Sequence, residues 1–286
     1  MAVVQMSAQD PRDPKAPPVT PGPIEVSKGV IRILAPNPSP MTLDGTNTYL
    51  VSGPDRSQAV VVDPGPDMEE HLLAIRMLIA ARQLAVRAVI TTHAHLDHAA
   101  LGPRAAEELG VPLLTASEIG DSPLAQRVVT ACGVRVLATP GHSADSVSYL
   151  SADGVLMSGD HLLGRGTTAI LHPDGSLGQF LGSLATVEAT EFAMIAPGHG
   201  PVMEADLGRR VIAYYRAHRL ERVDQVRQLL EGGDRVVVDL VAAIYGAIED
   251  PIVAWSARAS TLATITYLTQ EGDWSLEGDH IVRVRH

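Results

Sequence analysis

The sequence Thr92-His93-Ala94-His95-Leu96-Asp97-His98 carries the strongest signal in the chain. It follows the apolar run Ala88-Val89-Ile90, which is predicted to be a β-strand. At the end of an extended segment, the side chains of residues i and i+2 point the same way, so His93 and His95 can meet one ion. A turn after Leu96 then presents Asp97 and His98 to a second ion. Imidazole and carboxylate ligands together suit a borderline ion such as Zn²⁺.

Three later segments repeat one arrangement, in which an apolar strand leads through a tight turn to a ligand-type residue. The glycine before each of these residues lets the backbone turn sharply beside an ion. The segments are Val136–Gly141 before His142, Val155–Gly159 before Asp160, and Phe192–Gly198 before His199. A further predicted strand ends at Asp63 in the sequence Val-Val-Val-Asp-Pro-Gly.

These residues predict a site for two metal ions. A hydroxide held between two such ions is nucleophilic at neutral pH, so the pattern predicts hydrolysis of an ester-like, amide-like or phosphodiester bond. Asp97 and Asp160 are the predicted catalytic carboxylates, and Asp63 is expected to orient a ligand histidine. The predicted ligands are His93, His95 and His142 for the first ion and Asp97, His98 and His199 for the second, with Asp160 bridging.

The pattern His-x-His-x-Asp-His, followed by Gly-His, Gly-Asp and Gly-His after later strands, resembles the metallo-β-lactamase superfamily over about residues 28–205. The resemblance implies an αββα sandwich with the metals at the sheet edge and two Zn²⁺ ions per chain. Mn and Fe stay open as alternatives, because persulfide dioxygenases share the first motif and use a single iron.

A narrower resemblance extends over nearly the whole chain. The sequences Gly45–Leu50, Ser158–Asp160 and Gly164–Thr168, together with the C-terminal region, are similar to the lactamase-like endoribonuclease group. This resemblance implies cleavage of single-stranded RNA. His161 and Ser143 depart from the pattern of that group. The residues considered as substrate contacts are Asn47, His161, Arg165 and Thr168.

The order of predicted elements gives the domain organisation. Strands and helices mix without strict βαβ alternation, which favours an α/β class sandwich over a doubly wound sheet. Residues 1–23 are rich in proline and are expected to be a disordered lead-in. The catalytic domain is predicted at 24–205. Residues 206–286 are expected to form a winged-helix-like domain, with helices at 205–231, 235–246 and 257–270 before a terminal hairpin.

Composition limits the function classes. The chain has 286 residues and a formal net charge of −11, which disfavours duplex DNA as a partner. It has no apolar run of about 18 residues, so no membrane span or membrane partner is expected. A single cysteine, Cys132, excludes a disulfide framework and favours a reducing compartment, so a cytoplasmic location is predicted.

Two alternative functions remain open from the sequence. One is a thioesterase of glyoxalase II type, and the other is a zinc-sensing winged-helix regulator that binds nucleic acid and is not an enzyme. The expected substrate is therefore a small-molecule ester or thioester, or single-stranded RNA. A homodimer also stays open, because members of the superfamily often dimerise.

Overall fold

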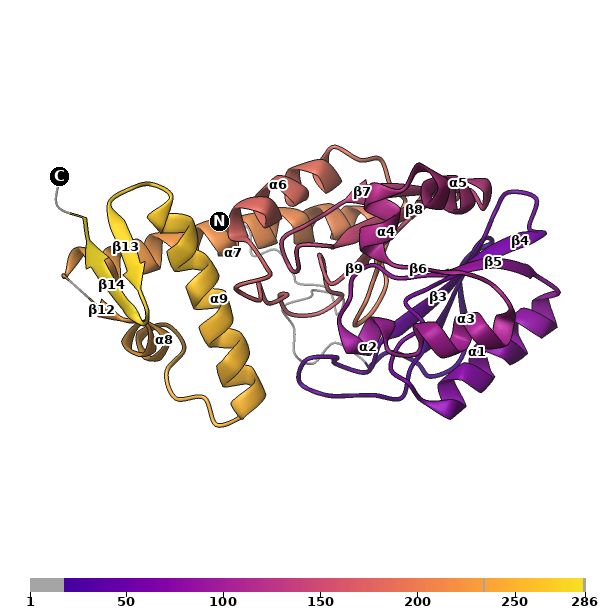
Figure 1. Cartoon of the computed structure of the whole chain (residues 1–286), viewed down its shortest axis with the longest axis horizontal. Coiled ribbons are helices and arrows are strands. Elements are labelled where there is room, and N and C mark those ends of the chain that lie inside the picture. Colours follow the sequence, from indigo (N-terminus) through magenta and orange to yellow (C-terminus); the bar gives the residue numbers. More distant parts are fainter. Residues whose placement is uncertain (1–17, 234, 285–286) are drawn as a thin grey trace, which may run out of the picture.

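A computed structural model describes residues 18–233 and 235–284. It has two parts, which Figure 1 shows side by side. The larger part contains two β-sheets and the helices that cover them, and the smaller part contains the C-terminal elements. None of the helices in the described part of the chain is both long and apolar enough to cross a membrane.

The first sheet has six strands. The three pairs formed by its first four strands are antiparallel, and the last two pairs are parallel. Its strands follow chain order: β1 (Ile24–Ser27), β2 (Val30–Leu34), β3 (Asn47–Ser52), β4 (Gln58–Val62), β5 (Ala85–Ile90) and β6 (Leu113–Leu114).

The second sheet has five strands and mixed pairing, with β9 and β10 parallel and the other neighbours antiparallel. In spatial order they are β11 (Met203–Glu204), β10 (Met194–Pro197), β9 (Val155–Gly159), β8 (Val147–Ser151) and β7 (Val134–Ala138).

Helices cover the outer face of each sheet. The helices α1 and α3 pack on the first sheet, and α6 and α7 pack on the second, while α4 and α5 close the edge between the sheets. Their bounds are α1 (Glu69–Arg82), α2 (Leu96–Ala99), α3 (Gly102–Leu109), α4 (Ala116–Asp121), α5 (Pro123–Ala131), α6 (Leu177–Glu188) and α7 (Ala205–Glu231).

The alternation of side chains along the strands explains the layers. In β3, Tyr49 and Val51 enter the core between the sheets, while Leu50 packs under α1 and α3. In β9, Met157 enters the same inter-sheet core, while Leu156 packs against α6 and α7. Because successive side chains of a strand point to opposite faces, strands that are apolar on both faces require cover on both. This arrangement confirms the predicted α/β sandwich.

The C-terminal part contains the end of α7, two further helices and a three-stranded antiparallel sheet in the order β12-β14-β13. One apolar cluster runs without interruption from Phe180 in α6, through Val223 in α7, to Trp274 and Ile281 in this sheet. The elements after α7 are β12 (Arg235–Val236), α8 (Val237–Tyr245), α9 (Pro251–Thr269), β13 (Trp274–Glu277) and β14 (His280–Arg283).

The structure moves the start of one predicted helix. Helix α9 begins at Pro251, six residues before the predicted start at residue 257. The carboxylate of Asp250 accepts hydrogen bonds from the backbone N–H groups of Ile252 and Val253, and proline is favoured in the first helical turn. The Asp250-Pro251 pair therefore forms the N-terminal end of this helix.

The N-terminal segment lies partly outside the described residues, since the description starts at residue 18. Within residues 18–23, Val19 is buried and donates a backbone hydrogen bond to Asp44, and the carbonyl of Thr20 accepts one from Arg32. This end of the proline-rich segment lies against the sandwich.

Candidate metal centre

The predicted ligands lie together where strands of both sheets end. Asp63 follows β4, and the segment from His93 to His98 follows β5. From the second sheet, Asp160 follows β9 and His199 follows β10. The loops after these strands bring seven side chains to one place, which we call the ligand cluster. Its members are His93, His95, Asp97, His98, His142, Asp160 and His199.

One half of the ligand cluster consists of three imidazoles. Nδ1 of His95 lies 3.0 Å from Nε2 of His93 and 3.0 Å from Nε2 of His142. His93 and His142 are buried, while His95 is partly exposed. Two ligand atoms bound about 2.0 Å from a tetrahedral ion lie about 3.3 Å apart, so these spacings suit one shared ion.

The other half combines two imidazoles with a carboxylate. Nε2 of His199 lies 3.2 Å from Nε2 of His98 and 3.1 Å from Oδ2 of Asp97. Asp97 and His98 lie in the first turn of the short helix α2, where the predicted turn after Leu96 is found. The side chain of Asp97 is 29% exposed and Leu96 is 77% exposed, so the cluster opens to solvent on this side.

Asp160 lies between the two halves. Its Oδ1 is 3.3 Å from Nε2 of His98 and 3.4 Å from Nε2 of His199, and its Oδ2 is 3.7 Å from Nε2 of His142. Oδ1 is buried and accepts no hydrogen bond of good geometry from the described residues. One carboxylate thus reaches both halves, as a bridging ligand would.

Hydrogen bonds on the far side of the rings fix the tautomers of the histidines. Nδ1 of His142 lies 2.7 Å from the carbonyl of Ala169, and Nδ1 of His199 lies 3.1 Å from the carbonyl of Gly45. A carbonyl only accepts, so each Nδ1 carries the proton and each Nε2 presents a lone pair to the cluster. Lone pairs that face one another across about 3 Å repel unless a cation lies between them, so this donor set fits metal ions.

Asp63 orients His98 in the same way. Its Oδ2 lies 2.9 Å from Nδ1 of His98, and its carboxylate also accepts hydrogen bonds from the backbone N–H and the hydroxyl of Thr92, at 2.6 and 2.8 Å. The hydroxyl of Thr92 in turn lies 3.0 Å from Nδ1 of His93. Asp63 has a φ of 50°, a left-handed conformation that Asp tolerates better than most residues.

The buried charges of the cluster shift one another's pKa values. Burial disfavours the charged form of His98, but Asp160, Asp63 and Asp97 outweigh it and raise the pKa of His98 well above its ordinary value. Burial also disfavours the Asp160 carboxylate, but His199 and His98 hold its pKa well below the ordinary value. The pKa of His93 is lowered by burial and by its histidine neighbours. Carboxylates and imidazoles therefore compensate one another inside the cluster.

Close packing demands glycine at two of the turns. A Cβ atom on Gly198 would lie 2.6 Å from Oδ1 of Asp160 and 2.6 Å from Cε1 of His98. A Cβ atom on Gly159, whose φ is 49°, would lie 2.5 Å from the hydroxyl oxygen of Thr92. Both distances are too short for a side chain, so these turns let the backbone of the second sheet approach the ligands.

The residues considered as substrate contacts have different surroundings. Asn47 is buried and donates hydrogen bonds to the carbonyls of Pro197 and Gly200, so it holds the turn that carries His199. Arg165 makes an ion pair with Asp44. The structure therefore gives Asn47 and Arg165 protein partners.

The remaining two candidates lie next to the cluster. The hydroxyl of Thr168 lies 3.2 Å from Nδ1 of His142. His161 follows Asp160 and packs against Phe180, and neither of its ring nitrogens has a hydrogen-bond partner among the described residues. Burial lowers the pKa of His161 to about 3, so its imidazole is neutral.

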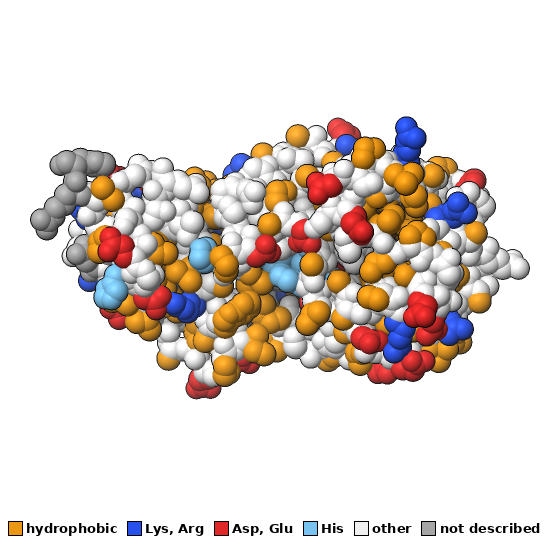
Figure 2. Space-filling view, viewed as in Figure 1, with side chains coloured by type: hydrophobic (Ala, Val, Ile, Leu, Met, Phe, Trp, Pro, Cys, Tyr) orange, Lys and Arg blue, Asp and Glu red, His pale blue; other side chains and the backbone are white. Residues whose placement is uncertain are grey.

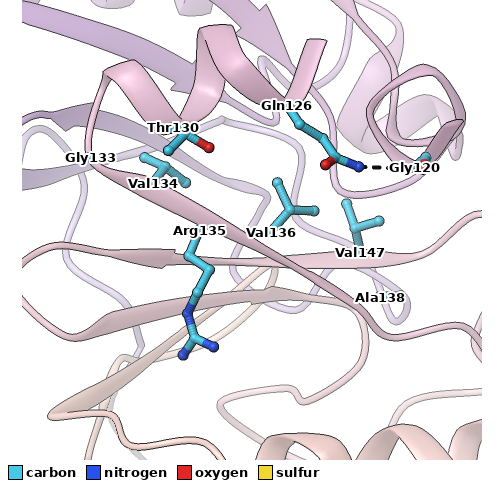
Figure 3. A pocket seen from close by; sticks show the side chains of 9 residues that line it. All are labelled: Gly120, Gln126, Thr130, Gly133, Val134, Arg135, Val136, Ala138 and Val147. Carbon is cyan, nitrogen blue, oxygen red and sulfur yellow. Dashed lines mark hydrogen bonds between the residues drawn. The ribbon is translucent and has the colours of Figure 1, made fainter. Parts of the chain in front are cut away.

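Two further pockets differ in their relation to the cluster. A pocket of about 570 Å³ lies between α4, α5 and β7, where Arg135 points away from the other lining side chains (Figure 3). No member of the cluster lines it.

On the face drawn in Figure 2, a histidine and several acidic side chains gather where the two parts of the molecule meet.

A second pocket, of about 440 Å³, adjoins the cluster through Thr168 and Ala169. We call it the arginine pocket, because Arg219 and Arg222 of α7 line it. Neither arginine was among the residues predicted from the sequence. A signal was present, because Arg219 lies four residues after buried Tyr215 and four before buried Val223, on the apolar face of α7. An arginine on such a face needs a polar partner.

Comparisons with known proteins agree with this arrangement. A sequence profile of the metallo-beta-lactamase superfamily matches residues 41–131. The chain is 31% identical to the beta-lactamase-like protein 2 homolog of Drosophila melanogaster, over 82% of this chain and 85% of that protein. It is 30% identical to the lactamase-like protein aptB of Emericella nidulans, over 86% of this chain and 82% of that protein.

The solved structures show the same fold. A beta-lactamase domain protein from Burkholderia ambifaria superposes with a TM-score of 0.74 at 24% identity, covering 93% of this chain and 95% of that one. At 24% identity this match shows a similar fold and does not indicate a shared activity. Its coverage includes the C-terminal part, so the elements after α7 also have a counterpart there.

Proposed function

The chain belongs to the metallo-beta-lactamase superfamily, and we propose that the ligand cluster holds two zinc ions and hydrolyses an anionic ester. Members of this superfamily are metal-dependent hydrolases, and the chain is an enzyme of this class. The observation that carries the proposal is the meeting of seven donor side chains, with Asp160 between a group of three imidazoles and a group of two imidazoles and a carboxylate. A donor set of imidazoles and carboxylates favours zinc.

Two ions bound in the cluster would supply Lewis acidity and lower the pKa of water towards neutrality. The chain's own residues orient the ligands and handle the proton of the attacking water. Asp63 holds the imidazole of His98 in place, and the carbonyl of Ala169 does so for His142. Asp97 lies at the solvent-exposed side, where its carboxylate can orient an incoming water molecule and accept its proton.

Single-stranded RNA is the substrate that we propose first. A two-metal centre suits in-line displacement at a phosphodiester, since the ions can stabilise both the attacking and the leaving oxygen. The C-terminal part, with the end of α7, two further helices and a three-stranded antiparallel sheet, has the secondary-structure elements of a winged-helix domain. It lies next to Thr168 and Ala169, which contact His142 of the cluster. We assign it that fold and a role in holding the substrate, in a cytoplasmic enzyme.

The test combines metal analysis with hydrolysis by the same preparation. The full chain, and a variant with Asp97→Ala and His98→Ala, are analysed for bound zinc and assayed with single-stranded RNA and with a glutathione thioester. We expect about two zinc ions per chain and RNA cleavage by the wild type alone. Thioester hydrolysis without RNA cleavage would replace the nuclease with a thioesterase. A single bound iron would contradict the two-zinc proposal.

A further inference from the structure

The arginine pocket is built from segments that are distant in sequence. The loop containing Thr168 forms one wall, and Arg219 and Arg222 of α7 form another. Tyr245 at the end of α8 and Ser256 and Ser260 of α9 complete it. The pocket therefore exists only where the catalytic sandwich and the C-terminal part meet (Figure 1).

Its charge is unusual for this chain. The formal net charge is −11, yet the described residues that line the pocket include two arginines and no aspartate or glutamate. Within residues 18–233 and 235–284, neither Arg219 nor Arg222 forms an ion pair with a carboxylate. The other α7 arginines Arg216 and Arg227 do form such pairs, with Glu188 and with Asp224 and Glu271.

Arg219 is the more deeply buried of the two arginines. It is 6% exposed, and its Nε has no hydrogen-bond partner among the described residues. Its guanidinium donates to the carbonyl of Thr168 and lies 5.4 Å from the centre of the Phe180 ring. A carbonyl and a ring compensate a buried charge only in part, and an isolated buried cation is costly. An anion in the pocket would supply the missing charge.

Arg222 is half-buried and better placed for a ligand that enters from solvent. One of its terminal nitrogens donates to Oε1 of Gln225 at 2.7 Å, and its guanidinium stacks 4.8 Å from the centre of the Tyr245 ring. The two arginines also act on the neighbouring His218, whose pKa is lowered first by burial and then by the positive charges of Arg219 and Arg222.

The pocket adjoins the reacting centre. Thr168 and Ala169 line it, and the same two residues contact Nδ1 of His142 with a hydroxyl and a carbonyl, at 3.2 and 2.7 Å. These contacts are on the side of the His142 ring that faces away from the ligand cluster, so a substrate that reaches the pocket passes around this ligand. Apolar Ile248 and Val253 also line it, so the pocket has room for an uncharged portion beside the charged one.

We propose that the arginine pocket binds an oxyanion of the substrate, a phosphate or a carboxylate. This inference rests on the hydrolase proposed above. The planar guanidinium groups match the oxygen geometry of both anions, and the polar residue Ser256 lines the same space. The pocket would then select substrates by charge, while the ligand cluster performs the hydrolysis.

The decisive variant is Arg222→Gln, because Arg222, unlike Arg219, does not bond to the Thr168 segment that contacts His142. The matched control is Arg210→Gln, which removes the same charge from an exposed position of α7 outside the pocket. Hydrolysis is measured with two substrate pairs, using the metal-loaded full chain. One pair is a dinucleoside monophosphate with and without a 5′-phosphate. The other is a thioester whose leaving group carries a carboxylate or the matching amide.

We expect kcat/KM to favour the charged member of one pair by about tenfold or more, as for a hydrogen bond to a charged group. Arg222→Gln should abolish this ratio and Arg210→Gln should preserve it. The pair that shows the ratio identifies the oxyanion. Equal ratios in both variants, or no preference in the wild type, would overturn the proposal.

A binding measurement separates the pocket from the hydrolase. Inorganic phosphate is titrated calorimetrically into the metal-loaded wild type and both variants, and acetate is titrated in parallel. Phosphate bound to the ions contributes alike in all three proteins, so a loss of about tenfold in affinity in Arg222→Gln alone reports the pocket. If the wild type hydrolyses none of the substrates but Arg222→Gln still shows this loss of phosphate affinity, the proposed function fails and the pocket stands. Equal phosphate affinities in Arg222→Gln and Arg210→Gln would contradict the proposal that the pocket binds an oxyanion.

Discussion

The ligand cluster and the arginine pocket are connected by Thr168 and Ala169, which line the pocket and contact His142, but the two regions differ in how their charges are compensated. In the cluster, Asp160 and Asp97 lie among imidazoles, and each sign offsets the other. In the pocket, Arg219 and Arg222 face no carboxylate among the described residues. The cluster is complete once the two sheets pack together, whereas the pocket also needs α8 and α9. Chemistry and substrate selection therefore reside in different parts of the chain.

The largest effect expected from this comparison is loss of a ligand. In the variant with Asp97→Ala and His98→Ala, we expect hydrolysis to fall by well over the 100-fold that a residue outside the ligand set can cost. Bound zinc, measured by mass spectrometry, should fall by about one ion per chain. Arg222→Gln should keep its full metal content. Loss of zinc in Arg222→Gln would break the separation between the two regions.

A smaller effect is expected at Asp63, which contacts the cluster through His98. Asp63→Asn keeps the size of the side chain but cannot accept from all three of its donors, which are Nδ1 of His98 and two groups of Thr92. Metal affinity should fall by about 10- to 100-fold. Titration with a chelator should show this loss for one of the two ions. Equal loss of both ions would show that Asp63 stabilises the whole edge and not one imidazole.

His71 tests a neutral imidazole that is not a ligand. The hydroxyl of Thr48 donates to the carbonyl of Asp63, so Nε2 of buried His71, 2.7 Å away, must donate to Thr48. Burial lowers the pKa of His71 to about 4. The unfolded chain takes up this proton near pH 6.5 and the folded chain only near pH 4, so the free energy of unfolding falls as the pH falls through this range.

Between pH 7 and pH 5 this histidine alone should cost about 2 kcal/mol of stability. Urea unfolding of the chelator-treated chain at both pH values should show that much less pH dependence in His71→Gln than in the wild type. His280→Gln, at an exposed position of β14, should keep the wild-type dependence. An unchanged dependence in His71→Gln would mean that His71 is charged when folded.

The smallest effect is expected at the rim of the arginine pocket. Tyr245→Leu removes the ring that lies 4.8 Å from the guanidinium of Arg222 and should cost about 0.5–1 kcal/mol of the free energy of unfolding. Phosphate affinity should fall less than in Arg222→Gln. Trp255→Leu, on the exposed side of α9, is the matched control. A larger loss in Tyr245→Leu than in Arg222→Gln would assign the ligand to the ring.

Local sequence was sufficient for the ligand cluster because each ligand follows a strand within a few residues. The apolar run before His93 and the turn glycine before Asp160 fix both the element and its end. Helix ends were less predictable, since capping depends on side-chain contacts. Asp67 is of a residue type that often caps helices, yet the N-cap of α1 is Met68, which makes no side-chain capping bond. Asp67 instead forms an ion pair with Arg104.

The arginine pocket could not be assembled from the sequence, because its walls come from three regions without a shared pattern. Arg216 and Arg227 of α7 are engaged in surface ion pairs with Glu188 and Glu271. The relevant arginine, Arg219, lies on the buried face instead. Which arginines of a helix find carboxylates depends on the neighbouring elements, and this information is tertiary.

Helix α7 determines where this chain can be recombined with another. It spans 27 residues without interruption, a rod of about 40 Å. The hydroxyl of its Tyr215 accepts backbone hydrogen bonds from Leu163 and Thr168, in the loop between β9 and α6. A chimera joined at residue 205 would import this rod with a foreign tail and lose those bonds. A junction after α7, at Gly232–Gly233, would leave the loop supported and exchange only the far wall of the pocket.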